Sequence, residues 1–305
     1  MFIERKVPRI VGISIAILLI VLGWLVVYAQ SQGEKPPVPD PPGPGGFGGP
    51  RGFGGPRGLR GSRSFQPIED FFPFMDPDQV EQPPPSPDSE FVFARMIYTS
   101  FGFRGFQSWT TDWPKSDRQF ILGIKRLTNI RVANDGTTVA LTDPKIFKYP
   151  FIYSVECGHW SLTDAEAQGL REYLKRGGFL FCDDFWGTYE WEIFMESISK
   201  ALPETRISEI PLSHPVFHSY YDIEELVQVP NVMQAITSSV TYEQDGYYPH
   251  CRGIFDQNGR LMAILNWNTD LGDAWEWADR PDYPARFSTY AYKLGINAIV
   301  YAMSH

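Results

Sequence analysis

Four polar residues in the middle of the chain have types and positions that could do chemistry. Glu156 and His159 follow an apolar run at 151–155, and Asp183 and Asp184 follow a second apolar run at 179–182. A carboxylate in such a place can ligate a divalent cation, act as a general acid or base, or hold a sugar hydroxyl. With an aspartate, Glu156 and His159 could form a mixed oxygen and nitrogen metal site, although their spacing matches no diagnostic motif.

The pair Asp183-Asp184 has two interpretations. Adjacent residues of an extended chain point in opposite directions, so one carboxylate is expected to face a cleft while the other turns inward. In the structural alternative, Asp183 accepts backbone N–H groups and Asp184 caps a helix that starts near Gly187. The sequence leaves both open.

Three further candidates follow later in the chain. Trp267 and Asp270 lie in a stretch that offers amide, carboxylate and indole groups, as carbohydrate binding would use. The alternative is a turn held by side-chain-to-backbone hydrogen bonds. His214 precedes Pro215, which disfavours a regular helix, so a site role for His214 competes with a backbone-bonded turn.

Tryptophans lie near several of the expected polar loops: Trp160, Trp186, Trp267 and Trp275. An exposed indole beside carboxylates is a platform for a sugar ring, and Trp186 directly follows the aspartate pair. Most tryptophans are at least partly buried, which is the competing interpretation.

A strand–helix–strand unit must position these side chains. The apolar runs at 151–155 and 179–182 are typical of strands buried on both faces. Between them, apolar residues recur at helical spacing from Leu162 to Leu174, with Ser161 or Thr163 as the N-cap and Gly177-Gly178 as the end. In open α/β sheets, ligands bind at the carboxyl ends of the strands, where the polar residues stand.

The same alternation extends through residues 90–305. Strands are expected at 91–98, 138–141 and 207–210, and helices at 117–128, 189–202 and 287–303. Asn258-Gly259 between two apolar runs predicts a hairpin over 251–266. The fold class is therefore α/β, with a mostly parallel sheet, helices on both faces and an antiparallel edge hairpin.

The residues before this domain are of two kinds. Residues 10–27 form an apolar run after Arg5, Lys6 and Arg9, which predicts either a signal peptide or an N-terminal membrane anchor within residues 1–30. Either one places the remainder outside the cytoplasm, on the cell membrane or in the periplasm or medium. Residues 31–89 hold more than half of the chain's 26 prolines and are expected to form a disordered linker.

Charge and cysteine content argue against a nucleic-acid partner and against a cysteine-based zinc site. The chain carries a formal charge of −9, and an acidic domain argues against a nucleic-acid partner. Its three cysteines, Cys157, Cys182 and Cys251, match no zinc motif. Cys157 and Cys182 could form a disulfide if their strands are neighbours, and the alternative is that all three are buried as small apolar residues.

Several short motifs together resemble the bacterial family known as domain of unknown function 4159. They are Gly177-Gly178-Phe179, Asp183-Asp184-Phe185-Trp186-Gly187, His214-Pro215-Val216-Phe217, Asp270-Leu271-Gly272 and Leu294-Gly295-Ile296-Asn297. The resemblance covers residues 90–305 and implies the flavodoxin-like fold of class I glutamine amidotransferases, with the biochemical function left open. Cys182 lacks the flanking glycines of the amidotransferase nucleophile turn, so that chemistry is not expected.

These observations favour an exported, non-catalytic domain that binds a ligand or forms a complex, with a divalent cation as a possible cofactor. Its partner would be an envelope glycan or a membrane protein. One alternative is a metal- or carboxylate-dependent hydrolase acting on an envelope glycan. Another is a purely structural scaffold.

Overall fold

A seven-stranded sheet with the order β2-β1-β3-β4-β7-β6-β5 forms the centre of the fold. The computed structural model describes residues 88–101 and 107–305. Strands β2, β1, β3, β4 and β7 are parallel, and β6 and β5 continue the sheet in antiparallel pairs. The strands are β1 (Ala94–Ile97), β2 (Thr137–Ala140), β3 (Phe151–Ser154), β4 (Phe179–Phe185), β5 (Arg206–Glu209), β6 (His250–Phe255) and β7 (Leu261–Trp267).

This order confirms the predicted fold class. With β7 counted as the fifth parallel strand, it is the 2-1-3-4-5 order of flavodoxin-like proteins. The hairpin predicted around Asn258-Gly259 joins β6 to β7, and Gly259 has a φ of 83° in its turn. The antiparallel edge therefore lies where the sequence placed it.

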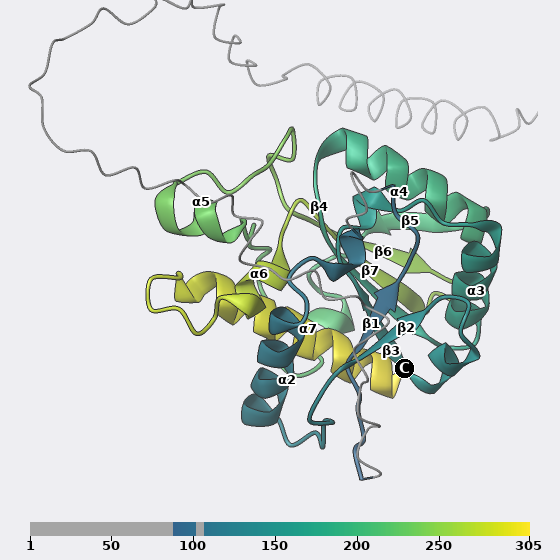
Figure 1. Cartoon of the computed structure of the whole chain (residues 1–305), viewed down its shortest axis with the longest axis horizontal. Helices are drawn as coiled ribbons and strands as arrows, with labels where there is room; N and C mark the ends of the chain where they lie inside the picture. The colour runs from purple at the N-terminus through teal and green to yellow at the C-terminus, as the bar shows by residue number, and fades with distance from the viewer. Residues whose placement is uncertain (1–87, 102–106) are drawn as a thin grey trace, which may run out of the picture. The chain divides into compact units, whose positions relative to one another are not determined.

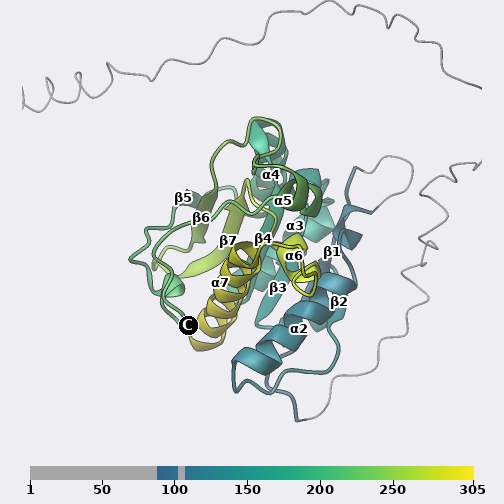
Figure 2. The same cartoon turned by 90° about the vertical axis from the view of Figure 1, so that its left-hand side faces the viewer.

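Helices cover both faces of the sheet, as Figures 1 and 2 show. One face packs against α2 (Lys115–Leu127), α6 (Leu271–Glu276) and α7 (Ala285–Ser304). The other face packs against α3 (Asp164–Lys175) and α4 (Gly187–Ala201). Consecutive strand residues point to opposite faces, so Phe151 joins the first core and Ile152 joins the second.

The βαβ unit of β3, α3 and β4 has the predicted end signals. Thr163, one of the two predicted caps, accepts a hydrogen bond from the backbone N–H of Glu166, whose carboxylate accepts one from the N–H of Thr163 in return. Gly177 ends α3 with a φ of 103°, in the left-handed region that glycine adopts at little cost. Two short helices, α5 (Val232–Thr237) and α6, were not predicted.

Strand β4 differs from the prediction at its end. Asp183 and Asp184 were expected to follow the strand, but β4 continues through both residues to Phe185. Its pairing with β7 is irregular between Cys182 and Phe185, and Asp184 has a φ of 53°. This β-bulge turns the two neighbouring carboxylates into different surroundings.

The three cysteines are buried and free. The Cys157 thiol donates to the backbone oxygen of Ser154 at 3.3 Å. Burial, and then the neighbouring thiol of Cys157, raise the pKa of Cys182. Cys157 and Cys182 are therefore neighbours, as expected from adjacent strands, and each remains a thiol.

The N-terminal predictions fall almost entirely outside the described residues. The signal peptide or anchor at 1–30 and nearly all of the linker at 31–89 belong to the part of the chain that the structure does not describe. Within 88–101 and 107–305, no helix has both the length and the apolar composition needed to span a membrane.

Candidate functional site

The polar residues of interest meet at the carboxyl edge of the parallel strands. β4 lies between β3 and β7, so the segments that follow β3 and β7 flank the end of β4. Glu156 follows β3, Asp184 lies in the β4 bulge, and Asp270 follows β7. This is the edge at which open α/β sheets bind their ligands.

Three aspartates from separate segments form what we call the acidic centre: Asp112, Asp184 and Asp270. One carboxylate oxygen from each lies within 4.8 Å of the other two. Asp184 comes from the bulge of β4, Asp270 is the N-cap of α6, and Asp112 lies between a short 3-10 helix, η3 (Ser108–Thr110), and α2. The centre is therefore assembled only when the fold is complete.

Local hydrogen bonds fix two of these carboxylates. Oδ1 of Asp184 accepts from the indole N–H of Trp186 at 2.8 Å, and Oδ1 of Asp270 accepts from the backbone N–H of Asp273 at 2.8 Å. Oδ2 of Asp112 is buried and has no hydrogen-bond partner within the described residues. A buried carboxylate oxygen without a donor is costly, and it marks a place where a cation or a proton is needed.

The electrostatics of the acidic centre point the same way. Burial, followed by the neighbouring carboxylates, raises the pKa of Asp112, Asp184 and Asp270 well above the ordinary value. Within the described part of the chain, none of the three forms an ion pair with Lys, Arg or His. The mutual repulsion of these carboxylates is thus not offset by a paired side-chain cation.

Arg95 in β1 is a fully buried cation whose guanidinium has a structural role. Its guanidinium donates to both oxygens of Asp117, with the Nη2–Oδ1 distance at 2.5 Å. It also donates to the backbone oxygens of Trp109 and Thr111, at 3.0 and 2.9 Å. Arg95 therefore braces the segment that carries Asp112 without contacting its carboxylate directly.

Gly272 allows Asp112 to approach α6. A Cβ atom at position 272 would lie 2.5 Å from Oδ2 of Asp112 and 2.9 Å from the hydroxyl of Tyr153. Real Cβ atoms do not come so close to other heavy atoms, so any other residue would displace one of these groups. The glycine is thus required by the packing of the site.

Left-handed backbone is concentrated at this edge. Three residues with positive φ carry carboxylates of the site: Asp112, Glu156 and Asp184. Two others support it, because Gln244 bonds to Glu190 and Asn268 accepts from the backbone N–H of Gly187. Such conformations cost about 1–3 kcal/mol each and persist where the surrounding structure enforces them. Among described residues other than glycine, those with positive φ are Asp112, Glu156, Asp184, Gln244 and Asn268.

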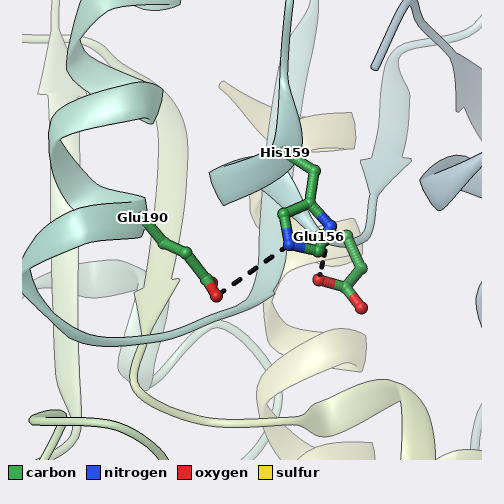
Figure 3. Close-up of side chains that lie close together, drawn as sticks. All are labelled: Glu156, His159 and Glu190. Carbon is green, nitrogen blue, oxygen red and sulfur yellow. Dashed lines mark ion pairs between the residues drawn. The ribbon is translucent and has the colours of Figure 1, made fainter. Parts of the chain in front are cut away.

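A second group, the Glu–His cluster, consists of Glu156, His159 and Glu190. Figure 3 shows the imidazole of His159 between the two carboxylates. Its Nδ1 lies 3.2 Å from Oε2 of Glu156, and its Nε2 lies 3.9 Å from Oε1 of Glu190. One ligand atom from each of the three lies within 4.8 Å of the others, so this cluster also has the geometry of a metal site.

In the Glu–His cluster, the pKa of Glu156 lies above that of His159, which reverses the usual order of a glutamate and a histidine. Burial, and then the charge of Glu190, raise the pKa of Glu156 to about 8, while burial lowers the pKa of His159. Glu156 also raises the pKa of Asp184, so the cluster and the acidic centre act on each other. Near neutral pH, the Glu156 carboxyl group therefore holds a proton and the His159 imidazole is neutral.

A third set of carboxylates adjoins the acidic centre on α6. Asp112, Asp273 and Glu276 each offer one oxygen, and these oxygens lie within 4.8 Å of one another. The hydroxyl of Tyr283 is buried and has no hydrogen-bond partner within the described residues. Burial, and then the charges of Asp270, Asp273 and Asp112, raise the pKa of Tyr283.

Asp183 has the structural role that the sequence left open. It is fully buried, and its carboxylate accepts from the backbone N–H groups of Leu271 and Gly272 and from the hydroxyl of Tyr153. Asp184 does not cap α4, because its carboxylate bonds the indole of Trp186 and the backbone N–H of Trp186 bonds Glu190. Asp183 thus accepts backbone N–H groups as the structural alternative predicted, while Asp184 faces the acidic centre.

The other candidates are placed as follows. Trp186 is 2% exposed, and Trp160 and Trp275 are also buried, so their rings are not available as exposed sugar platforms. Trp267 is half-buried, stacks on His250 and donates to the backbone oxygen of Gly187. The ring of His214 packs against Phe255 and Tyr301, and its Nδ1 accepts from Val216.

His214 lies at the opposite edge from the acidic centre. Phe255 ends the antiparallel strand β6, and Tyr301 packs on Phe179 at the start of β4. Both positions belong to the amino edge of the parallel strands. The structure therefore does not bring His214 together with the carboxylates.

Sequence reasoning missed Asp112, Glu190, Asp273 and Glu276. Asp270, Asp273 and Glu276 recur every third residue, a spacing that places successive carboxylates near one face of a helix and could have been recognised. Asp112 and Glu190 carry no such signal, because they reach the site only through the packing of loops and the turn after β4.

Comparison with known proteins gives a family and no function. No curated protein matches the chain significantly. The model of one protein family, described as Domain of unknown function (DUF4159), matches residues 92–303, which include every residue of the clusters described above. The chain therefore belongs to the DUF4159 family, as its motifs indicated.

Proposed function

We propose that this domain binds a divalent cation at the acidic centre and uses the cation to bind a further ligand. The observation that supports the proposal is the approach of three carboxylates, Asp112, Asp184 and Asp270, to within 4.8 Å. The unpartnered Oδ2 of Asp112 adds to it, because a cation supplies the missing interaction.

The donor set indicates which cations fit. Three carboxylates form an all-oxygen site, which suits hard ions such as Mg²⁺, Mn²⁺ and Ca²⁺. These ions take six or more ligands, so three carboxylates leave coordination positions for water or a bound molecule. Asp112 is partly exposed, and this side of the centre is the one from which a ligand would approach.

Calorimetric titration of the full-length chain with MgCl2, MnCl2 and CaCl2 tests the proposal. Asp184→Asn should weaken binding by more than about 100-fold, since it removes a charged ligand. The matched control is Glu172→Gln, which removes one carboxylate from the exposed surface of α3 and should leave binding unchanged. No heat of binding for any of the three ions would refute the proposal.

The proposed location is compatible with a weak site. The apolar run at 10–27 leads us to place the domain outside the cytoplasm, anchored or released. Extracellular calcium modules function with dissociation constants of about 10⁻⁴–10⁻³ M, so high affinity is not required there. The further ligand would then be an envelope glycan or a membrane protein, and the domain would act without catalysis.

The Glu–His cluster favours a second candidate function, a cation-assisted hydrolase acting on an envelope glycan. A protonated Glu156 beside a neutral His159 provides an acid and a base next to the proposed cation. Glu156→Gln would then abolish hydrolysis of a glycan substrate while cation binding at the acidic centre persists. Unchanged hydrolysis in that variant would eliminate this candidate.

A further inference from the structure

We propose that the site holds two divalent cations, with Asp112 bridging them. The second cation would be bound by Asp112, Asp273 and Glu276, whose oxygens lie within 4.8 Å of one another. This inference rests on the proposed function, because the first cation at the acidic centre shares the Asp112 carboxylate.

The hydroxyl of Tyr283, which is not one of the proposed ligands, provides a second observation. Only 6% of this residue is exposed, and its hydroxyl has no hydrogen-bond partner within the described part of the chain. A buried hydroxyl without an acceptor is unfavourable, and native structures rarely contain one. A second cation would bring water or a ligand oxygen into this region, and that oxygen would accept the phenolic proton.

Helix α6 orients its carboxylates as cation sites require. Asp273 is held by two donors, the backbone N–H of Val232 at 2.5 Å and the indole N–H of Trp277 at 3.1 Å. Donors that fix a ligating carboxylate from outside are typical of metal centres. Asp270, three residues earlier, belongs to the first centre, so one short helix supplies ligands to both cations.

The charge of Glu276 is not neutralised by a direct partner in the described chain. The ammonium of Lys115 lies 3.7 Å from Asp279 and over the ring of Trp277, so it is engaged elsewhere. Carboxylate oxygens of Asp273 and Glu276 lie within 4.8 Å of each other, so the two charges repel. A second divalent cation would offset this repulsion, as the first would for Asp184 and Asp270.

Mn²⁺ is the probe for the test, because two Mn²⁺ ions bridged by a carboxylate give a spin-coupled electron paramagnetic resonance spectrum. We expect two Mn²⁺ per full-length chain by calorimetry, together with the coupled spectrum at saturation. Glu276→Gln should reduce the stoichiometry to one and leave an uncoupled spectrum, whereas Glu172→Gln should retain both ions. Tyr283→Phe should weaken the second ion several-fold without changing the first.

The outcomes separate this inference from the proposed function. One Mn²⁺ per chain in both the native protein and Glu276→Gln overturns the second site and leaves the first intact. Two ions with an uncoupled spectrum overturn the bridging role of Asp112. No bound Mn²⁺ in the native protein refutes both. Glu276 is partly exposed at the end of α6, so a folded variant is expected, and its thermal unfolding verifies this.

Discussion

Asp183 and Asp184 are neighbours in β4, yet their carboxylates have separate environments. Asp183 accepts two backbone N–H groups at the start of α6, whereas Asp184 joins Asp112 and Asp270. The bulge between Cys182 and Phe185, with Asp184 in left-handed conformation, separates them. Asp183 thus holds the start of α6 in place, while Asp184 faces Asp270, the N-cap residue of the same helix.

Substitution of Asp183 should therefore destabilise the cation-free protein, whereas substitution of Asp184 should not. Asp183→Asn places an amide group among N–H donors and should lower the free energy of unfolding by about 1–3 kcal/mol. Asp184→Asn removes repulsion from the acidic centre and should leave the cation-free protein equally or more stable. Urea unfolding in EDTA measures both, and equal destabilisation would contradict the assignment of roles.

The stability of the cation-free protein should fall as pH rises. Burial raises the pKa of Asp183 to about 7, and burial with neighbouring carboxylates raises that of Glu156 to about 8 and that of Glu276 to about 7. The folded state therefore holds protons that the unfolded state releases above about pH 4, and this contribution is lost as pH rises through 7 to 8.

Thermal unfolding between pH 5 and pH 8, with EDTA or with saturating Mn²⁺, measures this dependence. Cations compete with protons for the same oxygens, so Mn²⁺ should stabilise the protein more at pH 8 than at pH 5. Stability that rises with pH in EDTA would contradict the raised pKa values.

Gly272→Ala should impair cation binding through packing alone. The added Cβ would lie 2.5 Å from Oδ2 of Asp112, which must then move away from the acidic centre. We expect weaker Mn²⁺ binding and a stability loss of about 1–3 kcal/mol. The control is Gly177→Ala, which strains a left-handed residue with nothing within 4 Å and should reduce stability while affinity stays unchanged.

Arg95→Met should destabilise the domain strongly, because it leaves the buried carboxylate of Asp117 unpaired. Loss of one partner of a buried ion pair costs about 3–5 kcal/mol. The double variant Arg95→Met with Asp117→Leu removes both charges and should recover part of that loss in urea unfolding. A double variant no more stable than the single one would show that the bonds from Arg95 to Trp109 and Thr111 dominate.

The fold could be predicted from the sequence because its signals are local. The apolar runs at 151–155 and 179–182, the cap at Thr163 and the turn at Gly259 each specify their own segment. The flavodoxin-like strand order was implied by the resemblance to the DUF4159 family and does not follow from these local signals. Helices α5 and α6 have six residues each, too few for a periodic pattern to be recognised.

The site could be predicted only in part. Asp184, Asp270, Glu156 and His159 follow or end strands, so the topology indicates where they meet. Asp112 is brought to them by the hydrogen bonds of Arg95, which begin on another strand. The bulge that separates Asp183 from Asp184 is a tertiary feature, since adjacent aspartates in a strand alone give no reason to treat them differently.

The reactivity of the buried cysteines can report how often the domain opens. Cys157, Cys182 and Cys251 are each at most 2% exposed, and burial raises the pKa of Cys182 and Cys251. A maleimide reagent can reach these thiols only when the surrounding core separates. The labelling rate of the unmodified protein therefore reports how often the molecule opens, and a bound cation should slow that rate without any engineered probe.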